Sequence, residues 1–291
     1  GGTLPRSAWD GLFAQLALES DTAAQTLGRL ALEGRVDITA EGVALTPTGR
    51  RDALALMRAH RIYEQYLAEH SGYAPAEWHE RAHHMEHRLD ARERERMASL
   101  LGNPLFDPHG DPIPTAGLTL PALPAGARDT AAEGLPEAGT LLRVVHIEDD
   151  DARRFGRIAA TGLAKDAVVR VAAGAEGSFA FDYEGEHFAL PAADLAAIDL
   201  RPLTPDEAAE VPADAFRMSR LAEGQTAVVA GLSPSCRGAL RRRLMDLGFV
   251  RGSRVSVGMR SPLGNPVAYV VRGTAIALRR EQARQIIVTP L

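Results

Sequence analysis

The amino-acid sequence predicts a multidomain α+β protein, with helices in its first part and small β-barrels in its second. Three observations predict this fold class. Apolar side chains recur at helical spacing through residues 7–101. A Pro/Gly-rich stretch follows over residues 103–138, and short alternating runs typical of strands make up the rest. The 291 residues are also too many for one ordinary domain.

The second half contains an internal repeat. Residues 181–203 (FDYEGEHFALPAADLAAIDLRPL) align without gaps on residues 269–291 (YVVRGTAIALRREQARQIIVTPL), and residues 162–171 match residues 248–257 at nearly the same offset. Such self-similarity indicates two copies of one structural unit. We therefore expect two small β-barrels of one type, with chance similarity of two β segments as the alternative.

Composition restricts the class of protein. No run of 18 apolar residues exists, so we expect no membrane insertion, and the N-terminus lacks the features of a secretory signal. A single cysteine, Cys236, excludes an internal disulfide framework and favours a reducing, cytoplasmic location. The net charge of −5 neither predicts nor excludes nucleic-acid binding, because only the charge of the local face matters.

The first part is expected to begin with two helices within residues 7–33, the second over about Asp21–Glu33. A short β-ribbon follows over residues 36–45. A long helix then runs from near Thr48 to about His70, because Leu54, Met57, Ile62 and Leu67 stay in helical register.

Two more helices are expected over about residues 76–89 and 91–101. The stretch NPLFDPHGDPIP after them predicts an irregular but fixed loop over Asn103–Pro114. Residues 117–138 carry several prolines and glycines with little apolar periodicity, which is typical of a linker.

The segment WHERAHHMEHRL, residues 78–89, carries the strongest chemical signal. On a helix that advances about 100° per residue, His79, His83, Glu86 and His87 share one arc, and the last three converge on one spot. Imidazoles and a carboxylate are good ligands for a borderline divalent metal. The preceding helix carries a second pair at i, i+4, His60 and Glu64, and two antiparallel helices would bring both sets together.

Two other interpretations of these histidines stay open. The segment is also compatible with a solvated, charge-rich helix. The string His79-Glu80-Arg81-Ala82-His83 matches the H-E-x-x-H motif of zinc metalloproteases, although the third-ligand pattern is absent. For His109, in the Pro-rich loop, we expect a loop-fixing hydrogen bond rather than a metal.

The segments 45–67, 78–89 and 102–114, taken in this order and spacing, resemble the diphtheria toxin repressor and manganese transport regulator family over about residues 7–203. The resemblance implies a winged helix-turn-helix, a helical metal-binding dimerisation domain and an SH3-like domain. It also implies an N-terminal helix that supplies one more metal ligand. Because no such helix precedes Ser7, we expect an N-terminal truncation or a start codon placed too late.

The resemblance also implies the metal ligands, residue by residue. The primary-site ligands would be His83, Glu86 and His87. The ancillary-site ligands would be His60, Glu64, His79 and Asp149, with Asp150 and Asp151 as competitors for the acidic position. Iron-responsive members usually have Cys at the position of His83 and manganese-responsive members have Glu, so the expected metal is Fe²⁺, with Mn²⁺ as the alternative and Zn²⁺ also compatible.

Residues 216–291 resemble the ferrous iron transport protein FeoA, an SH3-like protein that associates with a ferrous iron permease. The resemblance implies contact with a transport protein. Cys236 is expected to be a plain small residue, with a reactive loop thiol as the alternative. The expected organisation is a partial winged helix-turn-helix over 1–50, the metal-binding domain over 51–116, a linker over 117–138, an SH3-like domain over 139–203, a second linker over 204–215 and the FeoA-type domain over 216–291.

The helix over Asp21–Glu33 occupies the recognition position of the resembled family. Gln25 matches a position that contacts bases, and a glutamine can bond adenine bidentately in the major groove. Thr22 and Arg29 would reach phosphates or bases. A helix that only packs is the alternative, because this one has few cations.

The sequence therefore predicts a homodimeric, non-enzymatic repressor that binds double-stranded operator DNA when loaded with Fe²⁺ or Mn²⁺ and controls metal-uptake genes. Two alternative functions remain open. One is an accessory of ferrous iron transport that does not bind DNA. The other, more remote, is the zinc metalloprotease.

Overall fold

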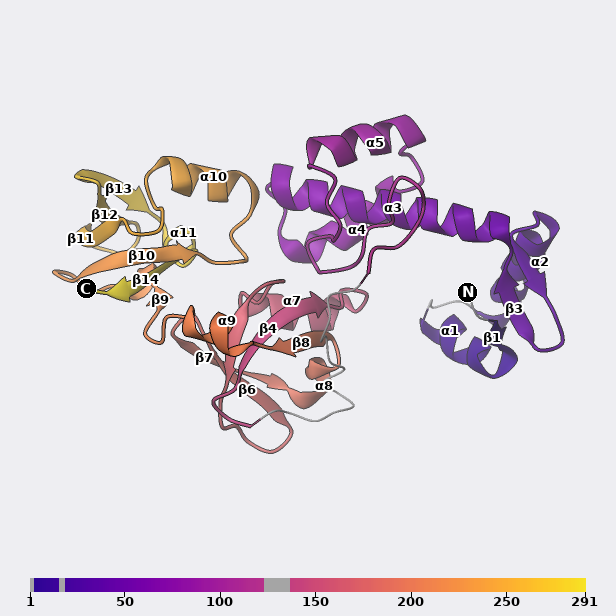
Figure 1. Cartoon of the computed structure of the whole chain (residues 1–291), viewed down its shortest axis with the longest axis horizontal. Coiled ribbons are helices and arrows are strands. Elements are labelled where there is room, and N and C mark those ends of the chain that lie inside the picture. The colour runs from indigo at the N-terminus through magenta and orange to yellow at the C-terminus, as the bar shows by residue number, and fades with distance from the viewer. Residues whose placement is uncertain (1–2, 16–18, 123–136) are drawn as a thin grey trace.

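The computed structural model describes residues 3–15, 19–122 and 137–291. The chain forms a small N-terminal lobe, a helical body and two β-lobes, and the long helix α3 leads from the first of these into the second (Figure 1). No helix among the described residues is long and apolar enough to cross a membrane. The predicted multidomain α+β fold is thus confirmed.

The N-terminal lobe combines short helices with a small antiparallel sheet in the order β1-β3-β2. The predicted ribbon is present as β2 and β3. Strand β1 was not predicted, because it contributes only two residues, which pair with the start of β3. The elements of this lobe are β1 (Leu4–Pro5), η1 (Arg6–Ala8), α1 (Trp9–Gln15), α2 (Ser20–Leu32), β2 (Val36–Ile38) and β3 (Gly42–Leu45).

Helix α3 (Pro47–His70) begins against the N-terminal lobe. The Thr46 hydroxyl caps it by accepting the Gly49 amide at 3.0 Å, and Pro47 occupies the first turn, where its missing N–H costs no hydrogen bond. A Cβ added at Gly49 would lie 1.8 Å from the Arg35 carbonyl oxygen. This close approach ties the start of α3 to the turn before β2.

Helices η2 (Pro75–Glu77), α4 (Trp78–Met85) and α5 (Ala91–Leu100) complete the helical body. The predicted helix over residues 76–89 is too long at its end. Asp90 adopts an extended conformation and caps α5 by accepting the Glu93 amide at 2.8 Å, so the chain must leave α4 before it. Residues 86–88 form a turn in which the Arg88 amide bonds the Met85 carbonyl, three residues back.

The loop over residues 103–114 is irregular and fixed, as predicted. One oxygen of the buried Asp107 carboxylate accepts three backbone amides, those of His109, Gly110 and Asp111, each at 2.9 Å. The loop also packs on β4, because the Ile147 amide donates to the His109 carbonyl at 2.9 Å. Most of the predicted linker lies outside the described residues.

The predicted repeat is confirmed element by element. Both β-lobes are antiparallel, and their strands follow the same spatial order, β7-β6-β5-β4-β8 in the first and β13-β12-β11-β10-β14 in the second, where β9 is added at the edge. The first lobe consists of β4 (Leu141–Ile147), α7 (Ala152–Ala160), β5 (Val168–Val171), β6 (Ser178–Tyr183), β7 (Glu186–Pro191), α8 (Ala192–Leu195) and β8 (Ile198–Pro202). After α9 (Pro205–Ala209), the second consists of β9 (Phe216–Arg217), η3 (Met218–Arg220), β10 (Thr226–Leu232), α10 (Gly238–Asp246), β11 (Arg254–Arg260), β12 (Val267–Val271), β13 (Thr274–Leu278), α11 (Arg280–Ala283) and β14 (Ile286–Pro290).

The second β-lobe contacts both the first β-lobe and the helical body. Arg217, 3% exposed, forms ion pairs with Glu184 at 2.9 Å and Glu186 at 2.8 Å across the junction between the β-lobes. On the other side, Arg242 on α10 donates to the Glu69 carbonyl near the end of α3. Cys236 lies in the core of the second β-lobe, where burial raises the pKa of its thiol to about 11. A buried thiol of this kind is not a reactive one, so the expectation of a plain small residue is confirmed.

Candidate metal centres

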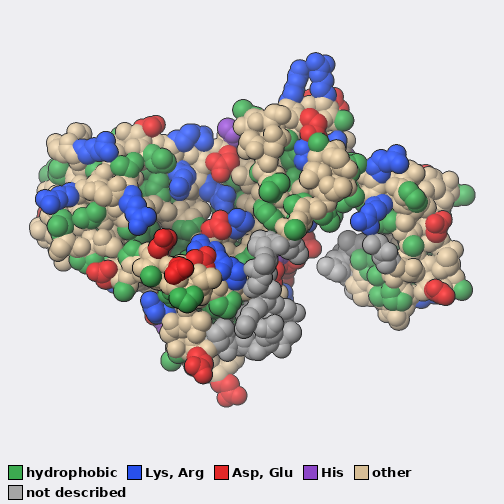
Figure 2. All heavy atoms as spheres, in the orientation of Figure 1, with side chains coloured by type: hydrophobic (Ala, Val, Ile, Leu, Met, Phe, Trp, Pro, Cys, Tyr) green, Lys and Arg blue, Asp and Glu red, His purple; other side chains and the backbone are tan. Residues whose placement is uncertain are grey.

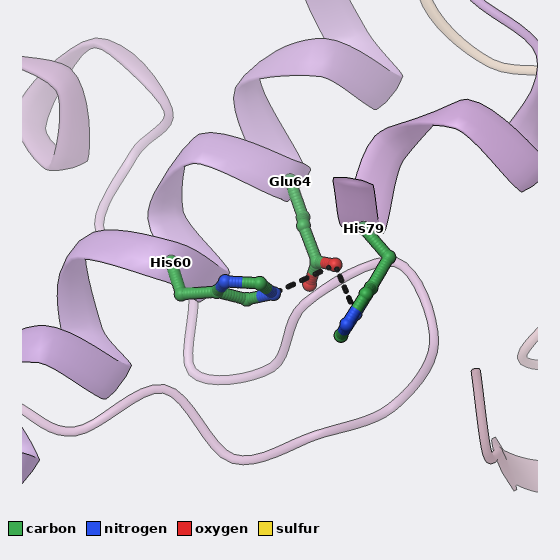
Figure 3. A group of neighbouring side chains, drawn as sticks. All are labelled: His60, Glu64 and His79. Carbon is green, nitrogen blue, oxygen red and sulfur yellow. Dashed lines mark hydrogen bonds and ion pairs between the residues drawn. The ribbon is translucent and has the colours of Figure 1, made fainter. Parts of the chain in front are cut away.

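The first candidate site, here called the inner cluster, comprises His60, Glu64, His79 and Asp149. His60 and Glu64 lie one turn apart on α3, and His79 projects toward them from α4, which packs alongside (Figure 3). His60 Nε2 lies 3.1 Å from Glu64 Oε1, and His79 Nδ1 lies 3.5 Å from the same oxygen. The structure thus joins the two halves of the predicted ligand set across two helices.

Asp149 reaches this cluster from the first β-lobe, directly after β4. Its Oδ2 lies 3.1 Å from His79 Nδ1, and the residue is 8% exposed. Asp150 approaches His79 only to 4.0 Å and its side chain is 62% exposed. Asp151 accepts the amides of residues 153 and 154 as the cap of α7. Of the three competing aspartates, Asp149 therefore has the geometry of a ligand.

The acidic and basic side chains of the inner cluster shift one another's pKa values in opposite directions. Burial alone would raise the pKa of Glu64, but hydrogen bonds from His60 and His79 outweigh it and lower the pKa to about 2. Hydrogen bonds to Asp149 and Glu64 raise the pKa of His79 to about 10. The carboxylates therefore favour the protonated form of His79 in the metal-free protein. A divalent cation would replace that proton, because metal-bound histidine must be neutral.

The second candidate site, here called the outer cluster, comprises His83, Glu86 and His87. His83 Nδ1 lies 3.1 Å and His87 Nε2 3.4 Å from Glu86 Oε1. Both imidazoles are exposed, whereas Glu86 is buried. Glu86 keeps helical backbone angles despite the early end of α4, so His83 and His87 both stay next to its carboxylate. The ligand atoms that lie within 4.8 Å of one another here are those of His83, Glu86 and His60, and His87 is outside that group.

His60 connects the two clusters. Its Nδ1 lies 2.7 Å from Glu86 Oε2, while its Nε2 faces Glu64. Burial would lower the pKa of His60, but Glu64 and Glu86 together raise it. The other carboxylate oxygen of Glu86 faces His83 and His87. The two clusters therefore meet at the contact between His60 of the inner cluster and Glu86 of the outer cluster.

The protease motif does not assemble as a zinc site. His79 turns to Glu64 and Asp149, whereas His83 turns to Glu86. Among the described residues, no candidate metal-binding group contains both histidines of the H-E-x-x-H string. The geometry therefore gives no support to the metalloprotease alternative.

His109 is where the structure departs from the sequence-based expectation. Its side chain is 4% exposed, and neither ring nitrogen makes a hydrogen bond within the described part of the chain. The loop is fixed by Asp107 instead. The expected loop-fixing role is thus wrong, because His109 points inward, with its Nδ1 3.1 Å from Asp149 Oδ2 and outside hydrogen-bond geometry. Its place at the end of the histidine-rich stretch was the only signal in the sequence.

The candidate DNA-reading residues share one exposed face of α2. Thr22, Gln25 and Arg29 are all exposed, while Ala23 is buried against the lobe. On the face visible in Figure 2, basic side chains are spread over every lobe rather than gathered in one patch. A cavity of about 630 Å³ is lined by Leu30 of α2, by Val36 and Leu45 of the β-ribbon, and by Glu86 and His87 of the outer cluster.

Comparison with known proteins identifies two families in the chain. Residues 46–115 match the iron dependent repressor, metal binding and dimerisation domain, and residues 216–290 match the FeoA domain. The iron-dependent repressor IdeR of Mycobacterium leprae is 29% identical over 187 residues, covering 61% of this chain and 81% of the relative.

A solved manganese-dependent transcriptional repressor in complex with manganese is 34% identical, with a TM-score of 0.57, covering 67% of this chain and 90% of the other. An Fe(2+) transport protein A/Fe(2+) transporter FeoB fusion protein of Porphyromonas gingivalis is 38% identical over 71 residues, which are 24% of this chain and 8% of that protein. The chain therefore belongs to the family of metal-dependent repressors that includes the diphtheria toxin repressor, and it carries a FeoA domain at its C-terminal end.

Proposed function

We propose that this protein is a repressor that binds operator DNA when it holds a divalent metal ion and thereby controls metal-uptake genes. One observation carries the proposal: nitrogen and oxygen ligands from α3, α4 and the first β-lobe converge on two adjoining clusters beside the helix that leads to the N-terminal lobe. The outer cluster would be the primary site and the inner cluster the ancillary site.

The chemistry of the donors supports Fe²⁺ as the metal, with Mn²⁺ as the alternative and Zn²⁺ also compatible. Imidazole and carboxylate ligands suit first-row transition ions, whereas Mg²⁺ and Ca²⁺ prefer oxygen ligands alone. The FeoA domain favours iron by association with iron transport. The cavity beside Glu86 and His87 leaves room at the outer cluster for a further ligand.

The continuous helix α3 supports a mechanical link between metal and DNA. It carries His60 and Glu64 in its middle, and its first turn is locked to the N-terminal lobe by the close approach at Gly49. Metal bound between α3 and α4 would favour one position of this helix, and so one spacing of the two α2 helices in a two-fold dimer. The dimer would then fit a palindromic operator.

DNA would be read by α2. Gln25 would contact a base edge, and Thr22 and Arg29 would contact bases or phosphates. Because α2 has few cations, the β-ribbon and the second protomer would supply part of the phosphate affinity. In this scheme residues 1–50 form the DNA-binding domain, 51–116 the metal-binding and dimerisation domain, 139–203 the SH3-like domain and 216–291 the FeoA-type domain, which would also contact a transport protein in the cytoplasm.

The test is metal-dependent DNA binding by the full chain. Fluorescence anisotropy with promoter DNA should show an affinity gain of roughly 10³-fold when Fe²⁺ or Mn²⁺ is added, given the usual gap between specific and non-specific binding. A chelator should reverse it. The double variant His83→Ala/His87→Ala should lose the metal response, whereas His84→Ala, exposed on the same helix but outside both clusters, should keep it. Operator binding by the double variant without metal would defeat the proposal.

A further inference from the structure

The second β-lobe carries positive charge that the proposed function does not use. Residues 216–291 contain thirteen arginines and three acidic residues. Two exposed arginines, one on β11 and one in the turn after β12, line a recess of about 270 Å³, here called the arginine recess. Its lining includes Thr226, Arg254, Ser256, Val270, Arg272 and Gly273, and no acidic residue among those described. Neither guanidinium makes a hydrogen bond or ion pair within the described part of the chain.

The internal repeat identifies the counterpart of this recess in the first β-lobe. In the gapless alignment of the two copies, Arg272 and Gly273 correspond to Glu184 and Gly185. The two turns share one backbone conformation, with φ of +51° and +77° in the first β-lobe and +49° and +80° in the second. Glu184 and Gly185 also line a cavity, of about 750 Å³. The two recesses are therefore equivalent surfaces of two copies of one fold.

In the first β-lobe, the chain that follows β8 binds to this surface. The Arg217 amide donates to the Glu184 carbonyl at 3.2 Å, and Arg217 Nε donates to the Glu184 carboxylate at 2.9 Å. A Cβ added at Gly185 would lie 2.5 Å from the Phe216 Cβ, so the two residues are in close contact. Several residues of the stretch 207–215 also line the cavity. The first copy thus holds a peptide segment through an ion pair at its turn.

The second β-lobe presents the same turn with the opposite charge. Arg272 stands where the first β-lobe has Glu184, and its side chain crosses Gly248, where an added Cβ would lie 3.1 Å from Arg272 Cδ. Over the aligned Gly162, the added Cβ would instead lie 2.8 Å from Nη2 of Arg217. An arginine side chain therefore lies over the same glycine in both copies. In the second copy it belongs to the lobe itself, so its ion-pair partner must bring a carboxylate.

We propose that the arginine recess binds an acidic peptide segment of a protein partner, whose carboxylates pair with Arg254 and Arg272. Guanidinium groups match carboxylates in charge and in bidentate geometry. The hydroxyls of Thr226 and Ser256 are further donors for the same carboxylates. The inference rests on the proposed function only in giving the FeoA-type domain a protein partner, and it adds the chemistry of that partner.

The position of the recess argues against operator DNA as its ligand. The second β-lobe and the N-terminal lobe, which carries α2, lie at opposite ends of the molecule (Figure 1). Helix α3 lies between them, and its 24 residues span about 36 Å at the helical rise of 1.5 Å per residue. An operator bound at α2 is therefore far from Arg254 and Arg272.

The experiment measures binding of a fluorescein-labelled decapeptide of alternating glutamate and alanine to the full-length chain, by anisotropy at physiological ionic strength. The test variant is Arg254→Val/Arg272→Asn, because valine occupies the aligned position 168 and asparagine tolerates a positive φ. It should weaken binding by about tenfold or more, since charge-assisted hydrogen bonds are lost. The control Arg243→Gln/Arg280→Gln removes equal charge from exposed arginines outside the recess and should change the affinity by less than about twofold.

The outcomes support or overturn the inference as follows. Equal weakening by the two double variants, or no binding to the unmodified chain, would overturn it. Duplex DNA of unrelated sequence and phosphatidylglycerol vesicles serve as competitors. If either displaces the labelled peptide at a lower concentration of negative charge than unlabelled peptide does, the recess is a phosphate site and the proposal is wrong.

A second measurement covers the case in which the test variant does not fold. A photoreactive form of the peptide is cross-linked to the unmodified chain. Cross-links on β10–β13 support the proposal, and cross-links confined to other elements contradict it. Metal-dependent operator binding should be unchanged in Arg254→Val/Arg272→Asn, because the recess lies outside both metal clusters and α2. Failure of this inference and failure of the proposed function are thereby distinguished.

Discussion

The contact between Gly110 and the first β-lobe makes the loop over residues 103–114 sensitive to one methyl group. Gly110 has a φ of +108°, and a Cβ added there would lie 2.2 Å from the Val145 carbonyl oxygen. Gly110→Ala therefore strains the backbone by ~1–2 kcal/mol and adds an overpacking cost of ~1–3 kcal/mol. Because backbone atoms form the wall, the loop must move, and His109 moves with it.

Gly102→Ala is the matched control. Gly102 also has a positive φ, +75°, but no atom lies within 4 Å of the Cβ that alanine would add. The control should therefore lose only the ~1–2 kcal/mol of backbone strain. Thermal unfolding followed by tryptophan fluorescence compares the two, since Trp78 lies next to His109.

The two variants should also differ in how much added metal stabilises them. Added Mn²⁺ should raise the unfolding temperature of the Gly102→Ala protein as much as that of the unmodified chain, because ligands that bind only the folded state stabilise it. The same addition should raise that of Gly110→Ala much less. Equal losses of stability and equal responses to metal in the two variants would refute the reasoning, because the close contact with the Val145 carbonyl would then have no energetic cost.

Three further predictions concern other parts of the chain. Arg217→Met should destabilise the protein by ~3–5 kcal/mol, since it leaves the buried Glu184 carboxylate without a counter-ion, while Arg284→Met at the same junction, where the arginine is more exposed and Glu186 keeps Arg217, should cost less than ~1 kcal/mol; chemical denaturation measures both, and equal effects would argue against a stabilising role of the buried Arg217–Glu184 pair. Burial would lower the pKa of His146, but two aspartates outweigh it and raise the pKa from 6.5 to about 10, so its stabilisation is complete below pH 6.5 and is lost as pH rises through about 10. His146→Gln should therefore be least stable relative to the unmodified chain near pH 6 and match it above pH 10, and a pH-independent difference in melting temperature would contradict this assignment. Gln25→Ala should weaken operator binding by ~1–3 kcal/mol without changing binding to unrelated DNA, which anisotropy with two duplexes can check; equal weakening on both duplexes would remove Gln25 from base reading.

Much of the fold could be predicted because its signals are local or repeated. The apolar register of α3 and the cap at Thr46 are properties of neighbouring residues, and the predicted helix differs from the observed one by about one residue at its start. The repeat located the β-lobes, because a gapless alignment requires the same strands and turns in both copies. The end of α4 was missed because the cap at Asp90, which belongs to the next helix, determines it.

Residue spacing predicted the candidate site where its residues share a helix, and the family resemblance added Asp149. The spacing of His60 and Glu64, and of His83, Glu86 and His87, follows from helical geometry. The meeting of the two clusters at His60 depends on how α3 and α4 pack, and the burial of His109 depends on a contact between the loop and the first β-lobe. Such long-range packing leaves no periodic trace in the sequence.

The most direct test of the account is the stoichiometry of metal binding by the intact chain. Equilibrium dialysis against ferrous, manganous or zinc ions should find up to two ions per chain, one for each cluster, and only one after His83→Ala/His87→Ala. If the intact chain takes up none of these ions in stoichiometric amounts, the two clusters are ordinary ion-pair networks and the proposed repressor mechanism is wrong.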